Sequence, residues 1–213
     1  MAGAFTSVND LFEAIAREDY VVLRNFENLA ETLVNSAHPD IDFLCRNPRR
    51  MTSRLHLKHR GKIPDGIHYK VQVGGTSVAV DLRHVGDGYL DPAWEERILL
   101  HRMRSRQGFY IPREKDHMYS LLYHVLIQKR AVADDYRKKL EGYFGDRLFA
   151  GERQSALEVL ERYMSAHNYR FTYPTYPLGI FNTEAVSGDL MEHNILKRLL
   201  HTGAGMVKGK KMK

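Results

Sequence analysis

The chain has 213 residues, of which 43% are hydrophobic and 27% charged, a composition typical of a globular protein with one large domain or one domain and a helical extension. Because no stretch approaches about 18 consecutive apolar residues, no transmembrane segment is expected. The first residues lack the basic start and apolar core of a secretion signal. A single cysteine, Cys45, excludes an internal disulfide framework and a cysteine zinc site, and it favours the reducing cytoplasm.

The formal net charge of +6 is unevenly distributed along the chain. One basic cluster lies in residues 46–62, and a second, Lys-rich cluster lies in residues 206–213. The second cluster is typical of a flexible, solvated tail. The first cluster would suit a polyanionic ligand such as a nucleoside triphosphate, which needs positive charge around its phosphates.

Helices and strands alternate in the first half of the chain. Apolar residues at helical spacing indicate helices, and β-branched, aromatic or alternating runs indicate strands. The expected elements are, in chain order, a helix at 8–17, a strand at 20–23, a helix at 26–34, a strand at 41–45, a helix at 49–58, strands at 68–73 and 77–82 joined by a Gly74-Gly75 turn, and a helix that Asp91-Pro92 opens.

The second half of the chain has a mostly helical pattern. Helices are expected at 117–128, 134–144, 154–166 and 189–201, with an irregular or extended segment at 169–181. We therefore expect an α+β protein that has a mixed sheet flanked by helices, followed by a mostly helical C-terminal half. The expected domains are an α/β domain at 1–112, a helical domain at 113–205 packed on it, and a basic flexible tail at 206–213.

Three aspartates are the candidates for catalysis and metal binding. Asp40 and Asp42 are two residues apart at the start of a strand, so their carboxylates point to the same face. Asp81 lies near the far end of another apolar strand. Two carboxylates at close range repel each other unless a cation lies between them, and oxygen ligands suit Mg²⁺ or Mn²⁺.

A strand, a helix, a strand with Asp-x-Asp, a hairpin and a strand with a third Asp follow one another from Tyr20 to Leu82. In this order the chain resembles the nucleotidyltransferase superfamily, which has the DNA polymerase beta-like fold. It looks most like the uncharacterised nucleotidyltransferase-like proteins seen beside surface-polysaccharide genes.

The resemblance implies an enzyme that transfers a nucleotidyl or phosphoryl group from a nucleoside triphosphate to a small-molecule or sugar acceptor, with polysaccharide biosynthesis as the setting. Asp40 and Asp42 would bind the Mg²⁺ or Mn²⁺ ion that chelates the β- and γ-phosphates. Asp81, with Asp40 or Asp42, would hold or orient a second metal ion and activate the acceptor hydroxyl. Two metal ions would stabilise the entering and leaving oxygens of an in-line displacement.

The chain departs from this family after the first strand. Active members usually carry a Gly-Ser or Gly-Gly pair there, whereas this chain has Arg24-Asn25. Both side chains can bind phosphate oxygens, but neither allows the same close approach of the backbone. Three arginines at helical spacing, which are Arg49, Arg50 and Arg54, are further candidates for contact with the nucleotide phosphates.

Two other functions stay open. A glycosyltransferase can use Asp-x-Asp to hold Mn²⁺ and a nucleotide sugar, although that fold normally places the motif much later in the chain than Asp40. A catalytically degenerate module could instead bind a nucleotide or a nucleic acid through its basic face, and the replacement of Gly-Ser favours this reading. Nucleic acid is the less favoured partner, because the chain has no recognisable aromatic RNA-binding motif.

Overall fold

The computed structural model describes residues 4–61, 65–150, 153–173, 182 and 186–193. The protein is α+β, as the sequence predicts, and it divides into two compact units. The sheet unit comprises Met1–Val85 and Glu95–Arg113, and the helical unit comprises Gly86–Trp94 and Glu114–Lys213. The sequence gives no sign that Gly86–Trp94 packs with the helical unit. The predicted basic tail at 206–213 lies outside the described residues.

The sheet unit contains the strands and the first helices. Its elements are β1 (Ala4–Phe5), α1 (Val8–Ala14), β2 (Tyr20–Val22), α2 (Leu29–Asn35), β3 (Asp40–Cys45), α3 (Pro48–Arg54), β4 (Lys58–His59), β5 (His68–Val73), β6 (Thr76–His84), β7 (Met103–Arg104) and β8 (Tyr110–Ile111). Helix α4 (Pro92–Leu100) begins in the helical unit and continues into the sheet unit.

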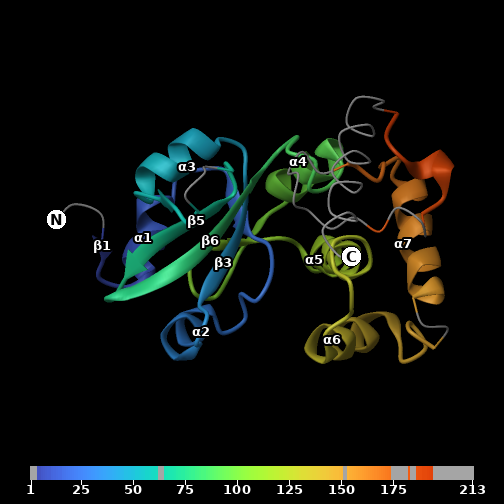
Figure 1. Cartoon of the computed structure of the whole chain (residues 1–213), viewed down its shortest axis with the longest axis horizontal. Coiled ribbons are helices and arrows are strands. Elements are labelled where there is room, and N and C mark those ends of the chain that lie inside the picture. The colour runs from blue at the N-terminus through green and yellow to red at the C-terminus, as the bar shows by residue number, and fades with distance from the viewer. Residues whose placement is uncertain (1–3, 62–64, 151–152, 174–181, 183–185, 194–213) are drawn as a thin grey trace, which may run out of the picture. The chain divides into compact units, whose positions relative to one another are not determined.

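In the described residues, β1 to β6 form one mixed sheet, and its central strands are labelled in Figure 1. The strand order is β1-β5-β6-β3-β2, and β4 pairs with β5 on the same side as β1. Strand β3 runs parallel to β6 and antiparallel to β2, while β5 and β6 form an antiparallel hairpin. The register between β3 and β6 places Asp42 directly opposite Asp81.

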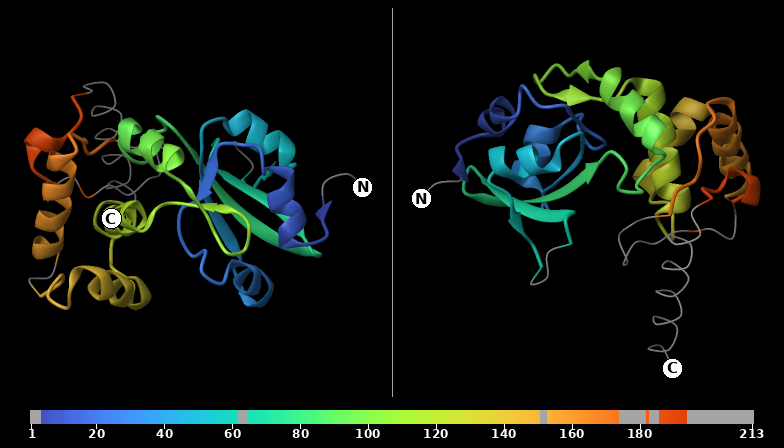
Figure 2. Two further views of the ribbon diagram at one scale, coloured as in Figure 1. Left: turned by 180° about the vertical axis from the view of Figure 1, so that it is seen from behind. Right: turned by 90° about the horizontal axis from the view of Figure 1, so that it is seen from above.

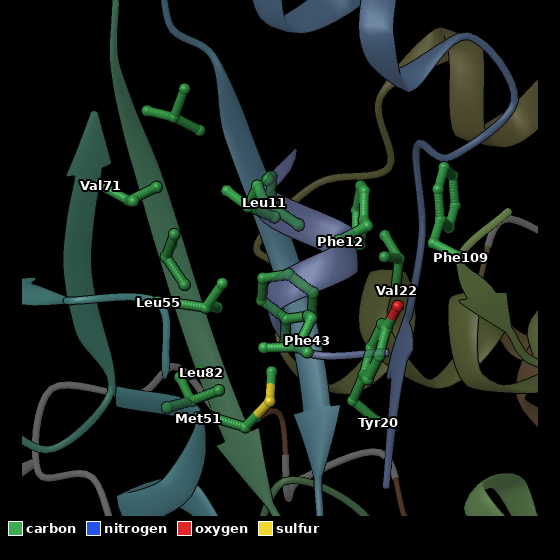
Figure 3. Packing of buried hydrophobic residues seen from close by; sticks show 14 of the residues in the cluster. Leu11, Phe12, Tyr20, Val22, Phe43, Met51, Leu55, Val71, Leu82 and Phe109 are labelled. Atoms are coloured by element: carbon green, nitrogen blue, oxygen red, sulfur yellow. The ribbon is translucent and has the colours of Figure 1, made fainter. Parts of the chain in front are cut away.

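Helices α1, α2 and α3 bury one face of this sheet. Their apolar residues form one cluster with the alternate strand residues Ile41, Phe43 and Cys45 of β3 and with matching residues of β2, β5 and β6. Figure 3 shows side chains of α1 and α3 directed towards Phe43 and Leu82. Seen from behind and from above, α1 and α3 lie on the same side of the strands (Figure 2). The opposite face of the sheet therefore carries the intervening, mostly polar residues.

Short-range signals in the sequence determine where the first helices begin. The side chain of Ser7 accepts a hydrogen bond from the backbone N–H of Asp10 at the start of α1. Asn47 does the same for the N–H of Arg50 at the start of α3, where Pro48 occupies the first turn. Both helices end earlier than predicted: α1 ends at Ala14 instead of residue 17, and α3 ends at Arg54 instead of residue 58.

The helical unit consists of α5 (Glu114–Ile127), α6 (Asp134–Phe144), α7 (Gln154–Ala166) and a short 3₁₀ helix, η2 (Gly188–Leu190). Its core centres on Trp94, which stacks on Tyr169 with ring centroids 5.5 Å apart. The indole of Trp94 and the hydroxyl of Tyr163 both donate to Asp116, which is buried. These bonds satisfy the carboxylate, as a buried acid requires.

The prediction of a last helix at 189–201 is wrong for its first residues. Residues 188–190 form the 3₁₀ turn η2, and Met191 then makes a β-bridge with Phe171. The remaining residues of the predicted helix, from 194 on, lie outside the described part of the chain, as does most of the predicted irregular segment 169–181. In the part that is described, no helix has the length and apolar character needed to cross a membrane.

Candidate functional site

The polar face of the sheet brings the predicted aspartates beside a set of basic residues. Strand pairing defines two rows across this face. One row contains Lys58 of β4, Lys70 of β5, Ala79 of β6 and Asp40 of β3. The acidic side chains therefore lie on β3 and β6, and the basic side chains lie on β4 and β5.

The second row lies one step further along the strands. It contains His68 of β5, Asp81 of β6 and Asp42 of β3, and the backbone N–H of Arg60 donates to the carbonyl of His68 at its outer end. The face thus changes from basic to acidic across four neighbouring strands.

Arg24 is ion-paired with Asp42. Its Nη2 atom donates to Oδ1 of Asp42 over 2.7 Å, and the two side chains are only 11% and 7% exposed. The loop after β2 carries Arg24, and the next residue, Asn25, has a φ of +57°, a conformation that asparagine tolerates better than most residues. The guanidinium therefore provides the positive charge that a buried carboxylate needs.

Asp81 lies between an acidic and a basic neighbour. Burial raises the pKa of Asp81 above its usual range, and the adjacent Asp42 carboxylate raises this pKa further. Electrostatic interactions with His68, Arg83 and Arg24 lower this pKa and so oppose the effect. Nε2 of His68 is 3.8 Å from Oδ1 of Asp81. The two carboxyl groups of Asp42 and Asp81 thus lie side by side, with Arg24 paired to the first and His68 close to the second.

Asp40 lines a pocket of about 500 Å³. The pocket is lined by Ala37, His38, Pro39, Asp40, Arg60, Lys70, Ser77 and Ala79. Asp40 is exposed, whereas Asp42 is buried. The two carboxylates of the Asp-x-Asp motif therefore have different environments: Asp42 lies beside Asp81 and Arg24, and Asp40 lies in a pocket that Arg60 and Lys70 also line.

The described residues do not bring Asp40, Asp42 and Asp81 together as a three-ligand metal group. Among them, no three His, Cys, Asp or Glu side chains are grouped so that they could hold a metal ion. Two of the predicted ligands, Asp42 and Asp81, do face each other on neighbouring strands. Mg²⁺ takes oxygen ligands and needs only one or two protein carboxylates when phosphate and water complete its shell, so Asp42 and Asp81 are the residues that could hold such an ion.

The arginines of α3 are placed elsewhere. Residues Met51 and Leu55, in and just after α3, belong to the core, so this helix covers the face of the sheet opposite to Asp42. Arg50 lies 3.0 Å from Glu18 and Arg54 lies 3.8 Å from the same carboxylate. Arg49 is exposed on the same helix. The structure therefore does not bring these three predicted phosphate ligands to the Asp42–Asp81 pair.

Sequence reasoning anticipates only part of the basic half of the polar face. Lys58 and Arg60 belong to the basic cluster 46–62, but the sequence predicts Lys58 at the end of a helix rather than in a strand, and Lys70 is only one polar residue of the alternating strand 68–73. The alternation itself was the available signal, because residues at even positions of 68–73 must share one face.

Comparison with known proteins adds no further assignment: no family model, no curated protein and no solved structure matches this chain.

Proposed function

We propose that the sheet unit is the catalytic unit of a metal-dependent transferase of nucleotidyltransferase type, which passes a nucleotidyl or phosphoryl group from a nucleoside triphosphate to a small-molecule or sugar acceptor. The observation that carries the proposal is the placement of Asp42 directly opposite Asp81, on neighbouring parallel strands and on the polar face of the sheet. The order of strands and the resemblance of the Asp-x-Asp segment support the same reading.

Asp42 and Asp81 would hold Mg²⁺ or Mn²⁺ together with oxygens of the bound triphosphate. When bound, the ion would neutralise phosphate charge and polarise the phosphorus that is attacked. The repulsion between the two carboxylates, which contributes to the raised pKa of Asp81, makes this a place where an added cation is favourable.

Arg24 would act on both the protein and the donor. In the described structure its guanidinium neutralises Asp42. A guanidinium also forms paired hydrogen bonds with phosphate oxygens. We propose that Arg24 turns to the phosphates when a metal ion takes over the neutralisation of Asp42. This side chain would then replace the contacts that the Gly-Ser pair makes in the proteins that this chain resembles.

A second candidate function is favoured by the same ion pair. If Arg24 permanently takes the role of the cation at Asp42, the sheet unit would bind an anionic ligand without a metal ion and without catalysis. This candidate predicts that ligand binding is independent of Mg²⁺ and weakens steeply with salt.

Thermal unfolding with ligands separates the two functions. The four nucleoside triphosphates are added with Mg²⁺, with Mn²⁺ or with a chelator to the wild-type chain and to the variants Asp42→Asn, Asp81→Asn and Asp146→Asn. Asp146 is exposed in the helical unit and is the matched control. A ligand at a hundred times its Kd adds about 2.7 kcal/mol, or a rise in Tm of roughly 5–10 °C for a chain of this size.

The transferase proposal expects a metal-dependent rise in Tm for at least one triphosphate, retained in Asp146→Asn and lost in both site variants. A rise that persists in the presence of chelator, and in Asp42→Asn and Asp81→Asn, would replace the transferase with the metal-independent binding module. The absence of any rise with all four triphosphates would overturn both readings of the nucleotide site.

A further inference from the structure

We propose that the pocket between β3, β6 and the β4–β5 edge binds a phosphate monoester, and that its natural ligand is a small hydroxylated phosphate such as a sugar phosphate. The role of this ligand as the acceptor rests on the proposed function, whereas its binding does not. The phosphate would lie against Arg60 and Lys70, and the hydroxyl groups would point towards Asp40.

The pocket has the size and shape that such a ligand needs. Its volume of about 500 Å³ is within the range of small-molecule sites. Three of its lining residues, Ala37, Ser77 and Ala79, have small side chains, so the floor of the pocket leaves room above the sheet. Of the basic residues that line the pocket, His38 and Arg60 belong to loops and Lys70 belongs to β5.

The basic residues of this edge are exposed and have no ion-pair partner among the described residues. Lys58 and Lys70 are directly opposite each other on β4 and β5, an arrangement of like charges that is unfavourable. In the described part of the chain, neither lysine nor Arg60 makes a salt bridge, in contrast to Arg46, which contacts both Asp19 and Glu96. A bound anion would supply the missing charge.

A phosphate monoester meets this requirement better than a carboxylate does. It carries a charge of about −1.5 to −2 at neutral pH and three acceptor oxygens, which can be shared between donors from different strands. The guanidinium of Arg60 offers a planar fork of donors, and the ammonium of Lys70 offers a compact charge. His38 adds a third nitrogen-bearing side chain to the pocket wall.

The acidic side of the same face argues against a long polyanion. A nucleic acid strand needs a continuous basic path, but β6, which is next to β5, carries Asp81, and β3, the strand after it, carries Asp40 and Asp42. A small ligand with one anionic end and a neutral hydroxylated end fits this change of charge, because carboxylates accept hydrogen bonds from hydroxyl groups. From β5 to β3 the face spans two strand spacings, or about 10 Å, a length suited to a monosaccharide phosphate.

In this orientation of the sugar phosphate, one of its hydroxyl groups would lie near the Asp42–Asp81 pair, where the transfer would take place. With its phosphate at β4 and β5, the ligand would extend over Ala79 towards Asp40, which is two residues from Asp42 on the same face of β3. The pocket would therefore hold the acceptor, and the Asp42–Asp81 pair would hold the donor and its metal ion.

The test measures binding without metal or nucleotide. Glucose 6-phosphate and glucose are titrated by calorimetry in chelator into the wild-type chain and into Lys70→Gln, Arg60→Gln and Lys138→Gln. Lys138 is exposed on α6 in the helical unit, so its variant loses the same charge away from the pocket. We expect glucose 6-phosphate to bind the wild type and Lys138→Gln equally, and to bind each pocket variant at least about tenfold more weakly. Glucose should not bind.

Equal affinity in all four proteins, or no binding of glucose 6-phosphate at millimolar concentration, would overturn the proposal. A thermal melt of each variant shows that it is folded, and amide shifts of Ala37, His38, Asp40 and residues 77–79 locate the ligand independently of the substitutions. If metal-free ATP displaces glucose 6-phosphate and depends on the same two residues, the phosphate site belongs to the donor, and the acceptor assignment fails.

Failure of this proposal is distinguishable from failure of the proposed function. Asp42→Asn should abolish metal-dependent nucleotide binding while leaving metal-free binding of glucose 6-phosphate within about twofold, because that side chain does not line the pocket. Loss of both by Asp42→Asn would mean that the two ligands share one site.

Discussion

The contact between Arg24 and Asp42 illustrates how one ion pair can determine the state of a site. Each partner is almost fully buried, so each would be left as an uncompensated charge if the other were removed. The neighbouring Asp81 makes loss of the guanidinium worse than loss of the carboxylate, because two acids would then face each other without it.

We therefore expect Arg24→Met to lower the free energy of unfolding by about 3–5 kcal/mol, and Arg24→Met with Asp42→Asn to recover much of this loss. Urea denaturation at pH 7 measures both values. The matched control is Arg46→Met, which breaks two ion pairs, with Asp19 and Glu96, whose side chains are about half exposed, and it should cost no more than about 1 kcal/mol. A single Arg24→Met variant as stable as the control would show that Asp42 is not dependent on the guanidinium.

Asp65 provides a residue-scale prediction about pH. Desolvation raises its pKa, but hydrogen bonds from the backbone and ring of His68 and from the N–H of Ile67 outweigh this effect and lower the pKa to about 2. A carboxyl group whose pKa falls on folding stabilises the protein above its unfolded pKa, and this contribution is lost as pH falls from about 4 to about 2.

Asp65→Asn should consequently be less stable than the wild type at pH 6, and the difference should narrow between pH 4 and pH 2. Chemical denaturation at a series of pH values measures it. A difference in stability that stays constant over this range would mean that the carboxylate form of Asp65 contributes nothing beyond its shape.

At the scale of the elements, the β5–β6 hairpin depends on two glycines. Gly74 and Gly75 have φ values of +55° and +83° between the paired residues Val73 and Thr76, as a two-residue type I′ turn requires. The Cβ of an alanine at Gly75 would meet no atom within 4 Å, so any loss of stability on that substitution would come from backbone strain and not from a steric clash.

Gly75→Ala should lower stability by about 1–2 kcal/mol, because the left-handed conformation is unfavourable for alanine. Gly142→Ala is the matched control. Gly142 lies within α6, and an added Cβ there would also meet open space, so this variant should gain about 0.5–1 kcal/mol from helix propensity. Thermal or urea denaturation measures the change in stability of both variants. An equal loss of stability in Gly142→Ala and Gly75→Ala would show that the left-handed conformation of Gly75 is not the cause.

Elements with a long periodic pattern were predictable from the sequence, and contacts between elements were not. The strand 68–73 and the helices 134–144 and 154–166 have the predicted bounds. The two-residue strands β1, β4, β7 and β8 were missed, because two residues carry no periodicity.

The candidate site was predictable to a similar extent. Alternation placed Asp40 and Asp42 on one face, as observed, but it could not show that Arg24 from a loop would reach Asp42. Nor could the helical spacing of Arg50 and Arg54 show that α3 covers the other face of the sheet, where both arginines form ion pairs with Glu18. Both outcomes depend on tertiary packing, which a one-dimensional pattern does not contain.

At the scale of the whole molecule, α4 joins the two units. Its first residues, Pro92–Trp94, belong to the helical unit, and the rest of the helix belongs to the sheet unit. Helical hydrogen bonds link each turn to the next, so unfolding of either unit removes part of α4 and weakens the remainder. We expect the two units to unfold in one transition for this reason.

Because the only tryptophan and the only cysteine of the chain are fully buried in different units, the protein carries two intrinsic optical and chemical reporters. Fluorescence of Trp94 follows the helical unit, and pulse labelling of the thiol of Cys45 follows the sheet unit. Coincident midpoints in urea would establish a single cooperative transition, and separate midpoints would show two independently folding units. Neither probe requires a mutation or a dye attached to the folded state.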